Sequence, residues 1–311
     1  MSCRRRAGRF AAVVAIEVSG LRKSYGSLDA VRDLDFRVNE GEVFALLGPN
    51  GAGKTTTLEI LEGFRTRTAG EVRVLGEDPA RAGRGQRQRI GIVLQGAVSE
   101  PYLTVREVLT RNAGYYPNPR PVVEVIEHVG LSDKADARVK TLSGGQLRRL
   151  DVGLGIVGDP ELLFLDEPTT GFDPTARRSA WELVRQLRGA GTTIVLTTHY
   201  MDEAQSLADR VAVINAGVIV AEGTPDTIGG RAQAAARIRF QLPPGATVGE
   251  LPVTVVGAAG VVELHTDDPV RALHTLTGWA LDRGVPLEGL SVDRPSLEDV
   301  YLALISEEDE A

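Results

Sequence analysis

A glycine-rich loop is the feature that most constrains this chain. Residues 48–56 read Gly-Pro-Asn-Gly-Ala-Gly-Lys-Thr-Thr and fit the pattern G-x-x-x-x-G-K-[ST]. An apolar run of buried-strand type precedes the loop at 43–47, and residues 56–61 can continue from it as a helix. Backbone N–H groups in such a loop, together with the helix N-terminus, favour an anion. Strand, loop and helix in this order predict a phosphate-binding site.

The loop also predicts which side chains serve a nucleotide. In this pattern the lysine, Lys54, neutralises phosphate charge, and the hydroxyl of Thr55 reaches Mg²⁺. A glycine-rich turn with an exposed lysine is the alternative, and it does not explain why the flanking strand and helix coincide with the loop. A phosphate loop alone predicts nucleotide binding without saying what the nucleotide does.

Composition narrows the class of protein. The chain has 311 residues, 42% hydrophobic and 25% charged, which is enough for one large domain and a small one. A net charge of −7 argues against a general nucleic-acid binder, so we expect no nucleic-acid partner. The single cysteine, Cys3, excludes a disulfide framework and favours the cytoplasm.

The N-terminus superficially resembles a signal peptide. Arginines at 4–6 and 9 precede the apolar run 10–16, but Glu17 ends that run and no A-x-A cleavage site follows, so a first β-strand is favoured. No uninterrupted apolar run elsewhere approaches the roughly 18 residues that a membrane span needs. Any spans would therefore belong to another chain.

Three single residues follow apolar segments and remain ambiguous at this stage. Tyr25 lies in a polar segment between the expected strands 13–18 and 34–38; it can stack on a base, but its position alone favours a turn tyrosine. Gln95 ends the strand pattern 90–94 and can simply cap the sheet. His199 ends the β-branched run 192–198, where a lone histidine is more often structural than catalytic.

The segment Leu-Ser-Gly-Gly-Gln at 142–146 begins a helix. Ser143 and Gln146 have the spacing of a capping box, and apolar residues follow at helical spacing. A cap does not explain Gly144 and Gly145, since each glycine costs a helix up to about 1 kcal/mol against alanine. Two of them in the first turn predict that something approaches the backbone closely, and beside a helix N-terminus the expected ligand is an anion.

Two adjacent carboxylates end another buried strand. Residues 161–165 are followed by Asp166, Glu167 and Pro168. Neighbouring strand residues point to opposite sides, so the two acids serve different purposes. One can hold Mg²⁺ while the other polarises an attacking water, as phosphoryl transfer requires.

These polar residues share one position in the predicted fold. Gly48, Gln95, Asp166 and His199 each follow an apolar strand. In open parallel α/β sheets, ligands bind outside the carboxyl ends of the strands. All four can therefore converge on one nucleotide.

The motifs, in this order, resemble the nucleotide-binding subunit of an ABC transporter. They are the Walker A loop 48–56, the Q-loop Gln95, the signature 142–146, the Walker B strand ending at Asp166 and Glu167, the D-loop residues 171–174, and His199. The resemblance covers residues 13–224 and implies a P-loop NTPase core of α/β class, with a mostly parallel sheet and a helical subdomain. Phe172 departs from the family, whose D-loop usually has leucine there, but Asp173 is retained.

The resemblance implies a role for each matched residue. Lys54 and the loop residues Gly48, Pro49, Asn50, Gly51, Ala52, Gly53, Thr55 and Thr56 would hold the phosphates of ATP. Thr55 and Asp166 would serve Mg²⁺, and Gln95 would sense the metal and water. Glu167 would be the general base, His199 would bind the γ-phosphate and Tyr25 would stack on adenine. These roles reverse the structural interpretations of Tyr25, Gln95 and His199.

The resemblance also implies partners. Ser143, Gly144 and Gly145 would bind ATP held by a second ATPase subunit, giving a homodimer with two interfacial nucleotides. Gln146 and Asp173 would also belong to the nucleotide-binding residues. A separate polytopic permease would bring the protein, peripherally, to the inner face of the cell membrane.

Composition changes after residue 224, which predicts a second domain. We expect an extension at 1–12, the ATPase domain at 13–225 and a small α+β domain at 226–311. Strands are expected at 236–242, 253–256 and 261–265, and helices at 269–283 and after Ser296, where Ser296 and Asp299 have cap spacing. Residues 294–302 resemble the C-terminal end of the drug-resistance, daunorubicin-type exporter ATPases.

The sequence therefore predicts an Mg-ATP hydrolase that powers export through a separate membrane subunit. An importer ATPase and a non-transport soluble ABC ATPase are the alternatives. A ribosome-acting ABC protein normally carries two ATPase halves, and a chromosome-organising ATPase carries a long insertion between Lys54 and Asp166; neither occurs here.

Overall fold

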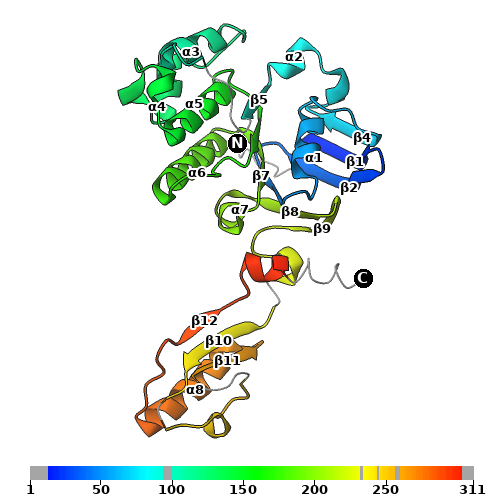
Figure 1. Ribbon diagram of the computed structural model, residues 1–311. Coiled ribbons are helices and arrows are strands. Elements are labelled where there is room, and N and C mark those ends of the chain that lie inside the picture. Colours follow the sequence, from blue (N-terminus) through cyan, green and yellow to red (C-terminus); the bar gives the residue numbers. More distant parts are fainter. Residues whose placement is uncertain (1–12, 94–99, 232–233, 244, 256–259, 303–311) are drawn as a thin grey trace, which may run out of the picture. The chain divides into compact units, whose positions relative to one another are not determined.

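The computed structural model describes residues 13–93, 100–231, 234–243, 245–255 and 260–302 (Figure 1). The chain divides into two compact units, Met1–Glu222 and Gly223–Ala311. Among the described residues no helix is both long and apolar enough to cross a membrane.

A six-stranded sheet forms the centre of the first unit, in the order β5-β6-β7-β3-β8-β9. The pairs β5–β6, β6–β7, β7–β3 and β3–β8 are all parallel. The strands are β3 (Val43–Leu47), β5 (Ile90–Val93), β6 (Leu162–Asp166), β7 (Thr193–Thr198), β8 (Arg210–Asn215) and β9 (Val218–Gly223). Every residue of β3, β6 and β7 is buried, which explains their uninterrupted apolar or β-branched sequences and confirms the parallel sheet.

A second, antiparallel sheet lies beside the first, in the order β2-β1-β4. Its strands are β1 (Val14–Tyr25), β2 (Leu28–Asn39) and β4 (Ala69–Val74). The expectation of a polar segment between two short strands was wrong here. β1 and β2 pair as one long hairpin from Val14 opposite Asn39 to Tyr25 opposite Leu28, with charged side chains alternating outward.

Helix α1 (Lys54–Leu61) contacts both sheets, through β2 and β4 on one side and β6 and β7 on the other. Leu58, Ile60 and Leu61 are buried in the core that the two sheets share. The phosphate loop at the start of α1 is thus supported by a helix that packing fixes on both sides.

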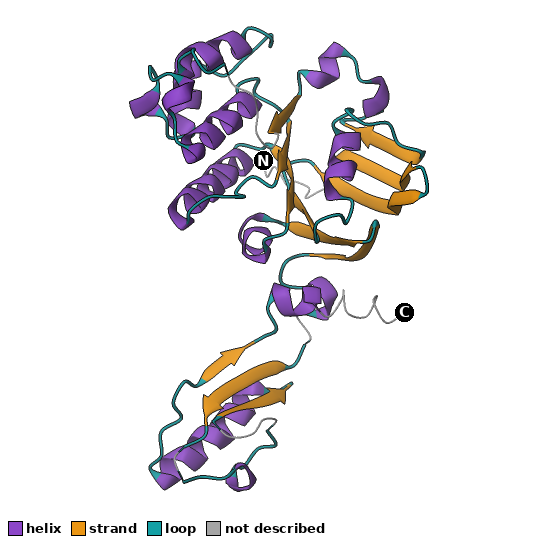
Figure 2. Ribbon diagram, in the orientation of Figure 1, coloured by secondary structure: helices purple, strands orange, loops and turns teal. Residues whose placement is uncertain are grey.

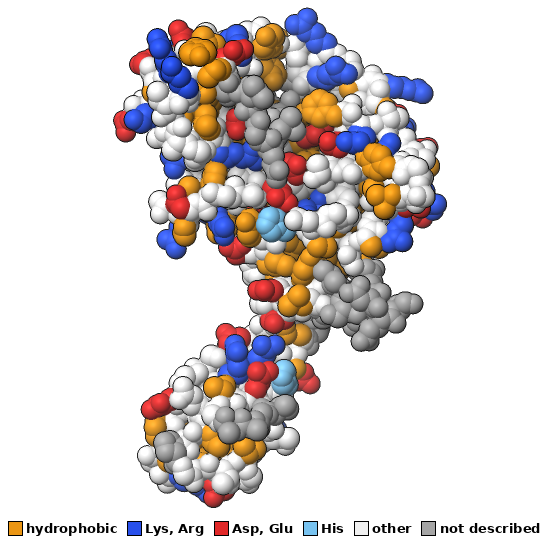
Figure 3. Space-filling model, viewed as in Figure 1, with side chains coloured by type: hydrophobic (Ala, Val, Ile, Leu, Met, Phe, Trp, Pro, Cys, Tyr) orange, Lys and Arg blue, Asp and Glu red, His pale blue; other side chains and the backbone are white. Residues whose placement is uncertain are grey.

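Helices α3 (Val105–Ala113), α4 (Val122–His128) and α5 (Gly144–Ile156) pack on one another as a helical subdomain (Figure 2). α5 also packs against β5 of the central sheet. The remaining helical elements of this unit are η1 (Pro79–Arg81), α2 (Arg84–Arg87), η2 (Ser132–Lys134), η3 (Val139–Thr141), α6 (Pro174–Gly189) and α7 (Met201–Leu207). On the face shown in Figure 3, basic and acidic side chains are interspersed over this unit, with several basic ones near α2.

The second unit is a small α+β fold with its own core. β10 (Ala236–Gln241) pairs antiparallel with β11 (Val261–Thr266) and β12 (Ser291–Asp293), and α8 is Pro269–Arg283. Its other elements are η4 (Ile228–Gly230) and η5 (Val248–Glu250). Residues 297–302 are helical, and Ser296 and Asp299 form the expected cap. A strand was expected at 253–256; residues 253–255, the part of it that the structure describes, are not in a strand.

Glu62 at the end of α1 carries a buried carboxyl group. Both of its oxygens lack a hydrogen bond from the described residues, and it lines a cavity of about 400 Å³ with Ile92, Asn112 and Tyr116. Burial, with the charges of Asp166 and Glu59, raises the pKa of Glu62 to about 8.

This raised pKa predicts a pH-dependent stability. The unfolded carboxyl ionises near pH 4.5, so its contribution to folding is fully present below that pH and is lost as the pH rises through about 8. Glu62→Gln cannot ionise, so relative to wild type we expect it to gain stability between pH 5 and 8.5, at most about 1.4 kcal/mol per pH unit. Urea unfolding of both proteins across this range measures the difference; a difference that does not change with pH would contradict the assignment.

Candidate active site

The phosphate loop connects β3 to α1 and encloses the lysine side chain. Lys54 is 5% exposed, and its Nζ donates to the carbonyl oxygens of Gly48 at 2.8 Å and Pro49 at 3.0 Å. Gly53 has φ 102°, and a Cβ there would lie 2.5 Å from the carbonyl oxygen of Ala30. Only glycine fits this turn, which lets the loop wrap tightly before α1 begins.

Two carboxylates lie close to that lysine. Burial lowers the pKa of Lys54, while the negative charges of Glu167 and Asp166 act in the opposite direction. Nζ is 3.9 Å from Glu167 Oε1. The cation is therefore already balanced by acids at the end of β6.

Asp166, the last residue of β6, is 8% exposed. One of its carboxylate oxygens accepts a hydrogen bond from the Thr197 hydroxyl on the neighbouring strand β7. This contact fixes the carboxylate at the carboxyl edge of the sheet. Sequence reasoning missed Thr197, because its partner belongs to a strand 31 residues away.

Glu167 has a left-handed backbone, with φ 45°. Its N–H donates to the backbone oxygen and the hydroxyl oxygen of Thr197, both at 3.1 Å. Its Oε1 lies 3.2 Å from His199 Nδ1, and its Oε2 accepts from the Thr170 hydroxyl at 3.1 Å. Burial raises the pKa of Glu167, but His199, Thr170 and Lys54 outweigh burial and leave that pKa below its ordinary value.

The structure thus brings four predicted residues together at the carboxyl edge of the sheet. Lys54, Asp166, Glu167 and His199 come from the ends of β3, β6 and β7, which are neighbours in the sheet. Gln95 lies outside the described residues. A carboxylate beside a histidine and a buried lysine can accept a proton while the lysine balances phosphate charge.

Glu203 is a further buried acid near this edge that sequence reasoning missed. It is fully buried on α7 and its Oε1 accepts from the Thr169 hydroxyl at 2.8 Å and from Trp181 Nε1 at 3.2 Å. These contacts join the segment after Glu167 to α6 and to the helix after His199. Glu203 is buried with Ala204 and Leu207 on one side of α7, and an acid at helical spacing from apolar residues is the signal that could have identified it.

The signature segment begins α5 as predicted. Ser143 and Gln146 form both halves of a capping box: Gln146 Oε1 accepts from Ser143 N at 2.9 Å, and Ser143 Oγ accepts from Gln146 N at 3.4 Å. A Cβ added at Gly144 or Gly145 would meet nothing within 4 Å. Packing within the described chain therefore does not require these glycines.

Asp173 and Tyr25 have structural contacts of their own. Asp173 caps α6, because its Oδ1 accepts from the N–H groups of Thr175 and Ala176 at 2.8 and 2.9 Å. Tyr25 is 39% exposed at the end of β1, with Lys23 Nζ 4.9 Å and Arg65 Cζ 5.3 Å from its ring centroid. The tyrosine ring thus already has two cationic neighbours.

The residues present fit a magnesium ion bound with a nucleotide. No group of three or more His, Cys, Asp or Glu suited to a metal occurs within the described ranges. Mg²⁺ commonly takes only one or two carboxylates together with substrate phosphates and waters. The Asp166 carboxylate and the exposed Thr55 hydroxyl in the first turn of α1 are the matching donors.

Known proteins are similar to this chain in sequence and in fold. A family model described as ABC transporter matches residues 31–170, and one described as ABC transporter domain-containing protein-like, C-terminal domain, matches residues 236–296. The daunorubicin resistance ATP-binding protein DrrA3 of Streptomyces coeruleorubidus is 38% identical over 307 residues, covering 94% of this chain and 96% of the relative.

A second relative has a similar sequence, and a solved structure has a similar fold. The Nod factor export ATP-binding protein I of Bradyrhizobium diazoefficiens is 44% identical over 220 residues, covering 69% of this chain and 72% of its own. The dimeric structure of MJ0796, a bacterial ABC transporter cassette, has a TM-score of 0.61 at 24% identity and covers 67% of this chain and 98% of that chain. This chain belongs to the ABC transporter ATP-binding proteins, whose ATP hydrolysis is coupled to transport.

Proposed function

We propose that this protein binds and hydrolyses Mg-ATP to drive export through a separate membrane permease. The observation that carries the proposal is the position of the Glu167 carboxylate, 3.2 Å from His199 Nδ1 and 3.9 Å from Lys54 Nζ. The direction of transport is supported by the names of both relatives, one for daunorubicin resistance and one for Nod factor export. The first of these relatives also aligns through the C-terminal unit.

The proposed roles follow from the chemistry of each group. Lys54 and the loop N–H groups hold the phosphates, Thr55 and Asp166 hold Mg²⁺, and His199 contacts the γ-phosphate. A bound Mg²⁺ would neutralise phosphate charge. Gln95 would sense metal and water, and Tyr25 would stack on adenine beside the cationic groups of Lys23 and Arg65.

Glu167 would accept the proton of the attacking water. Its pKa lies below the ordinary value, so the carboxylate is ionised at neutral pH and ready to orient a water. His199 and Thr170 each hold one of its oxygens, which limits the directions from which a water can be engaged. Asp166 is the last residue of β6 and Glu167 follows it with a left-handed backbone, and the two acids would divide the work between metal and water.

The open space around Gly144 and Gly145 supports a dimer. We propose that Ser143, Gly144, Gly145 and Gln146, with Asp173, contact the ATP of a second copy of this chain. A homodimer bound to a polytopic permease would act at the inner face of the cell membrane.

Lys54→Ala should remove ATP binding together with hydrolysis. Lys54 is the cation enclosed by the loop, and the alanine leaves the phosphates without its charge. Lys140→Ala is the control, because Lys140 is exposed on η3. Titration with a fluorescent ATP analogue checks this; unchanged affinity in Lys54→Ala would contradict the assigned role.

Glu167→Gln should separate binding from chemistry. The glutamine keeps the shape but cannot accept the proton, so turnover should fall by roughly 10² to 10⁴. Loss of one negative charge near the γ-phosphate should also make the ATP-bound dimer persist. Phosphate release and size-exclusion chromatography with Mg-ATP measure both effects. Wild-type turnover, or a monomer that binds ATP tightly, would show that the base or the dimer is assigned wrongly.

The permease prediction can be tested in the source cell. Detergent-solubilised membranes should yield this protein together with a polytopic chain, since the described part of this chain has no spanning helix. Mass spectrometry of the affinity-purified complex identifies that partner. Recovery with ribosomes or DNA alone would exclude a transport role.

A further inference from the structure

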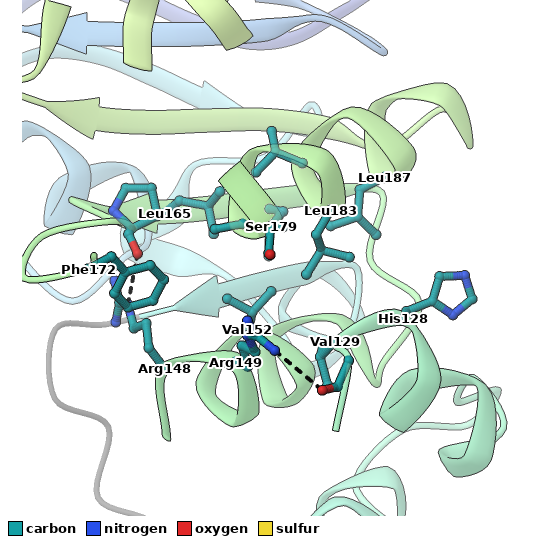
Figure 4. A pocket seen from close by; sticks show the side chains of 15 residues that line it. His128, Val129, Arg148, Arg149, Val152, Leu165, Phe172, Ser179, Leu183 and Leu187 are labelled. Carbon is teal, nitrogen blue, oxygen red and sulfur yellow. Dashed lines mark hydrogen bonds between the residues drawn. The ribbon is translucent and has the colours of Figure 1, made fainter. Parts of the chain in front are cut away.

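The Arg148 side chain connects α5 to the loop after β6. Its Nη2 donates to the carbonyl oxygen of Asp166 at 2.9 Å, and its Nε donates to the carbonyl oxygen of Pro168 at 3.3 Å. Figure 4 shows the Arg148 side chain directed to this loop beside Phe172. The two accepting carbonyl groups belong to the residues immediately before and after Glu167. α5 therefore holds the backbone on both sides of the proposed general base.

The Glu167 backbone needs such support. A non-glycine residue at φ 45° lies in the left-handed region, which costs on the order of 1 kcal/mol and persists only where the surroundings fix it. The hydrogen bonds from Glu167 N to Thr197 hold it from the β7 side. Arg148 holds the adjoining peptide groups from the α5 side.

An arginine suits this position for geometric and electrostatic reasons. The planar guanidinium presents donors in a fixed fork, so one side chain can bind two carbonyl oxygens, whereas a lysine presents a single ammonium group. Burial lowers the pKa of Arg148, and the charges of Asp151, Asp166 and Glu203 oppose that effect. The cation is thus half-buried among three carboxylates.

We propose that Arg148 is a positioning residue for ATP hydrolysis: it fixes the orientation of Glu167 by binding the carbonyl groups on either side of it. The inference rests on the general-base role proposed for Glu167. Arg148 lies five residues after Ser143 on the same helix, so the helix start and the Glu167 backbone share one rigid element. Displacing a reacting group by about 1 Å can cost up to about 10² in rate, so loss of this contact should slow the chemical step.

The neighbouring arginine provides a matched control. Arg149 lies on the same helix and lines the same cavity of about 150 Å³ as Arg148. Its Nη1 donates to the carbonyl oxygen of Gly130 at 3.4 Å, next to Val129 and not to the loop beside Phe172 (Figure 4). Arg148→Gln and Arg149→Gln remove the same charge from the same helix, and only the first releases the Glu167 backbone.

Steady-state ATPase kinetics of the full chain with Mg-ATP test the proposal. Arg148→Gln should lower kcat by about ten- to a hundredfold while KM for ATP stays within about twofold, because ATP binding does not use this contact. Arg149→Gln should leave both values near wild type. Arg148→Lys should recover part of kcat, since an ammonium group can reach one of the two carbonyl oxygens.

A double-mutant cycle with Glu167→Gln distinguishes positioning from a general structural effect. When the base is absent, nothing remains for Arg148 to orient, so Arg148→Gln should not lower the residual rate of Glu167→Gln further. The proposal would be overturned if the rate losses of the two single variants multiplied in the double variant. A raised KM at unchanged kcat in Arg148→Gln, or an equal loss of kcat in Arg149→Gln, would also overturn it. If Arg148→Gln does not fold, the same double-mutant cycle can be measured with Arg148→Lys in its place. Wild-type turnover in Glu167→Gln would instead refute the base assignment itself.

Discussion

The parallel pairing of β3, β6 and β7 positions the side chains of the candidate active site. Leu47 lies opposite Thr198 in the β3–β7 ladder, and Asp166 lies opposite Thr197 in the β6–β7 ladder. Because the three strands end level with one another, the next residues along the chain emerge at one edge. These are the phosphate loop, Glu167 and His199. A one-residue slip of β6 would turn Asp166 to the wrong side of the sheet.

The charged side chains at this edge of the sheet partly offset one another within the chain itself. Burial lowers the pKa of Lys54, and the charges of Glu167 and Asp166 oppose that effect. The same lysine and His199 help to keep Glu167 ionised. Lys54 and Glu167 therefore each stabilise the charged form of the other. The lysine also donates to two loop carbonyl oxygens, and these contacts hold the side chain near the place where we propose that phosphate binds.

Much of this arrangement could be predicted from the sequence, because fully buried parallel strands are short apolar runs that end where polar residues begin. The helix starts at Ser143 and Ser296 could be predicted for a similar reason, since a cap is a local pattern. The β1–β2 hairpin was missed because its outward side chains are charged, so half of each strand looks like a loop.

The remaining misses share a physical cause. Thr197, Glu203 and Arg148 act through partners 18 to 34 residues away, and no local pattern identifies such pairs. Asp173 caps α6, which is also a local pattern, but this role was not predicted because Asp173 was interpreted only as part of the D-loop. The proposed nucleotide contacts of Tyr25, Gln95 and the signature segment stay predictions.

The space around each glycine shows whether packing within the chain explains why the residue is a glycine. At Gly53 an added Cβ would collide with the backbone of Ala30, so packing within the chain accounts for the residue. At Gly144 and Gly145 the same Cβ would enter open space, although alanine would stabilise the helix by up to about 1 kcal/mol at each position. A stability cost with no internal cause argues for a molecule that approaches the helix from outside. The N-terminus of α5 favours an anion, and in the homodimer that we propose the ATP of the second subunit would provide one.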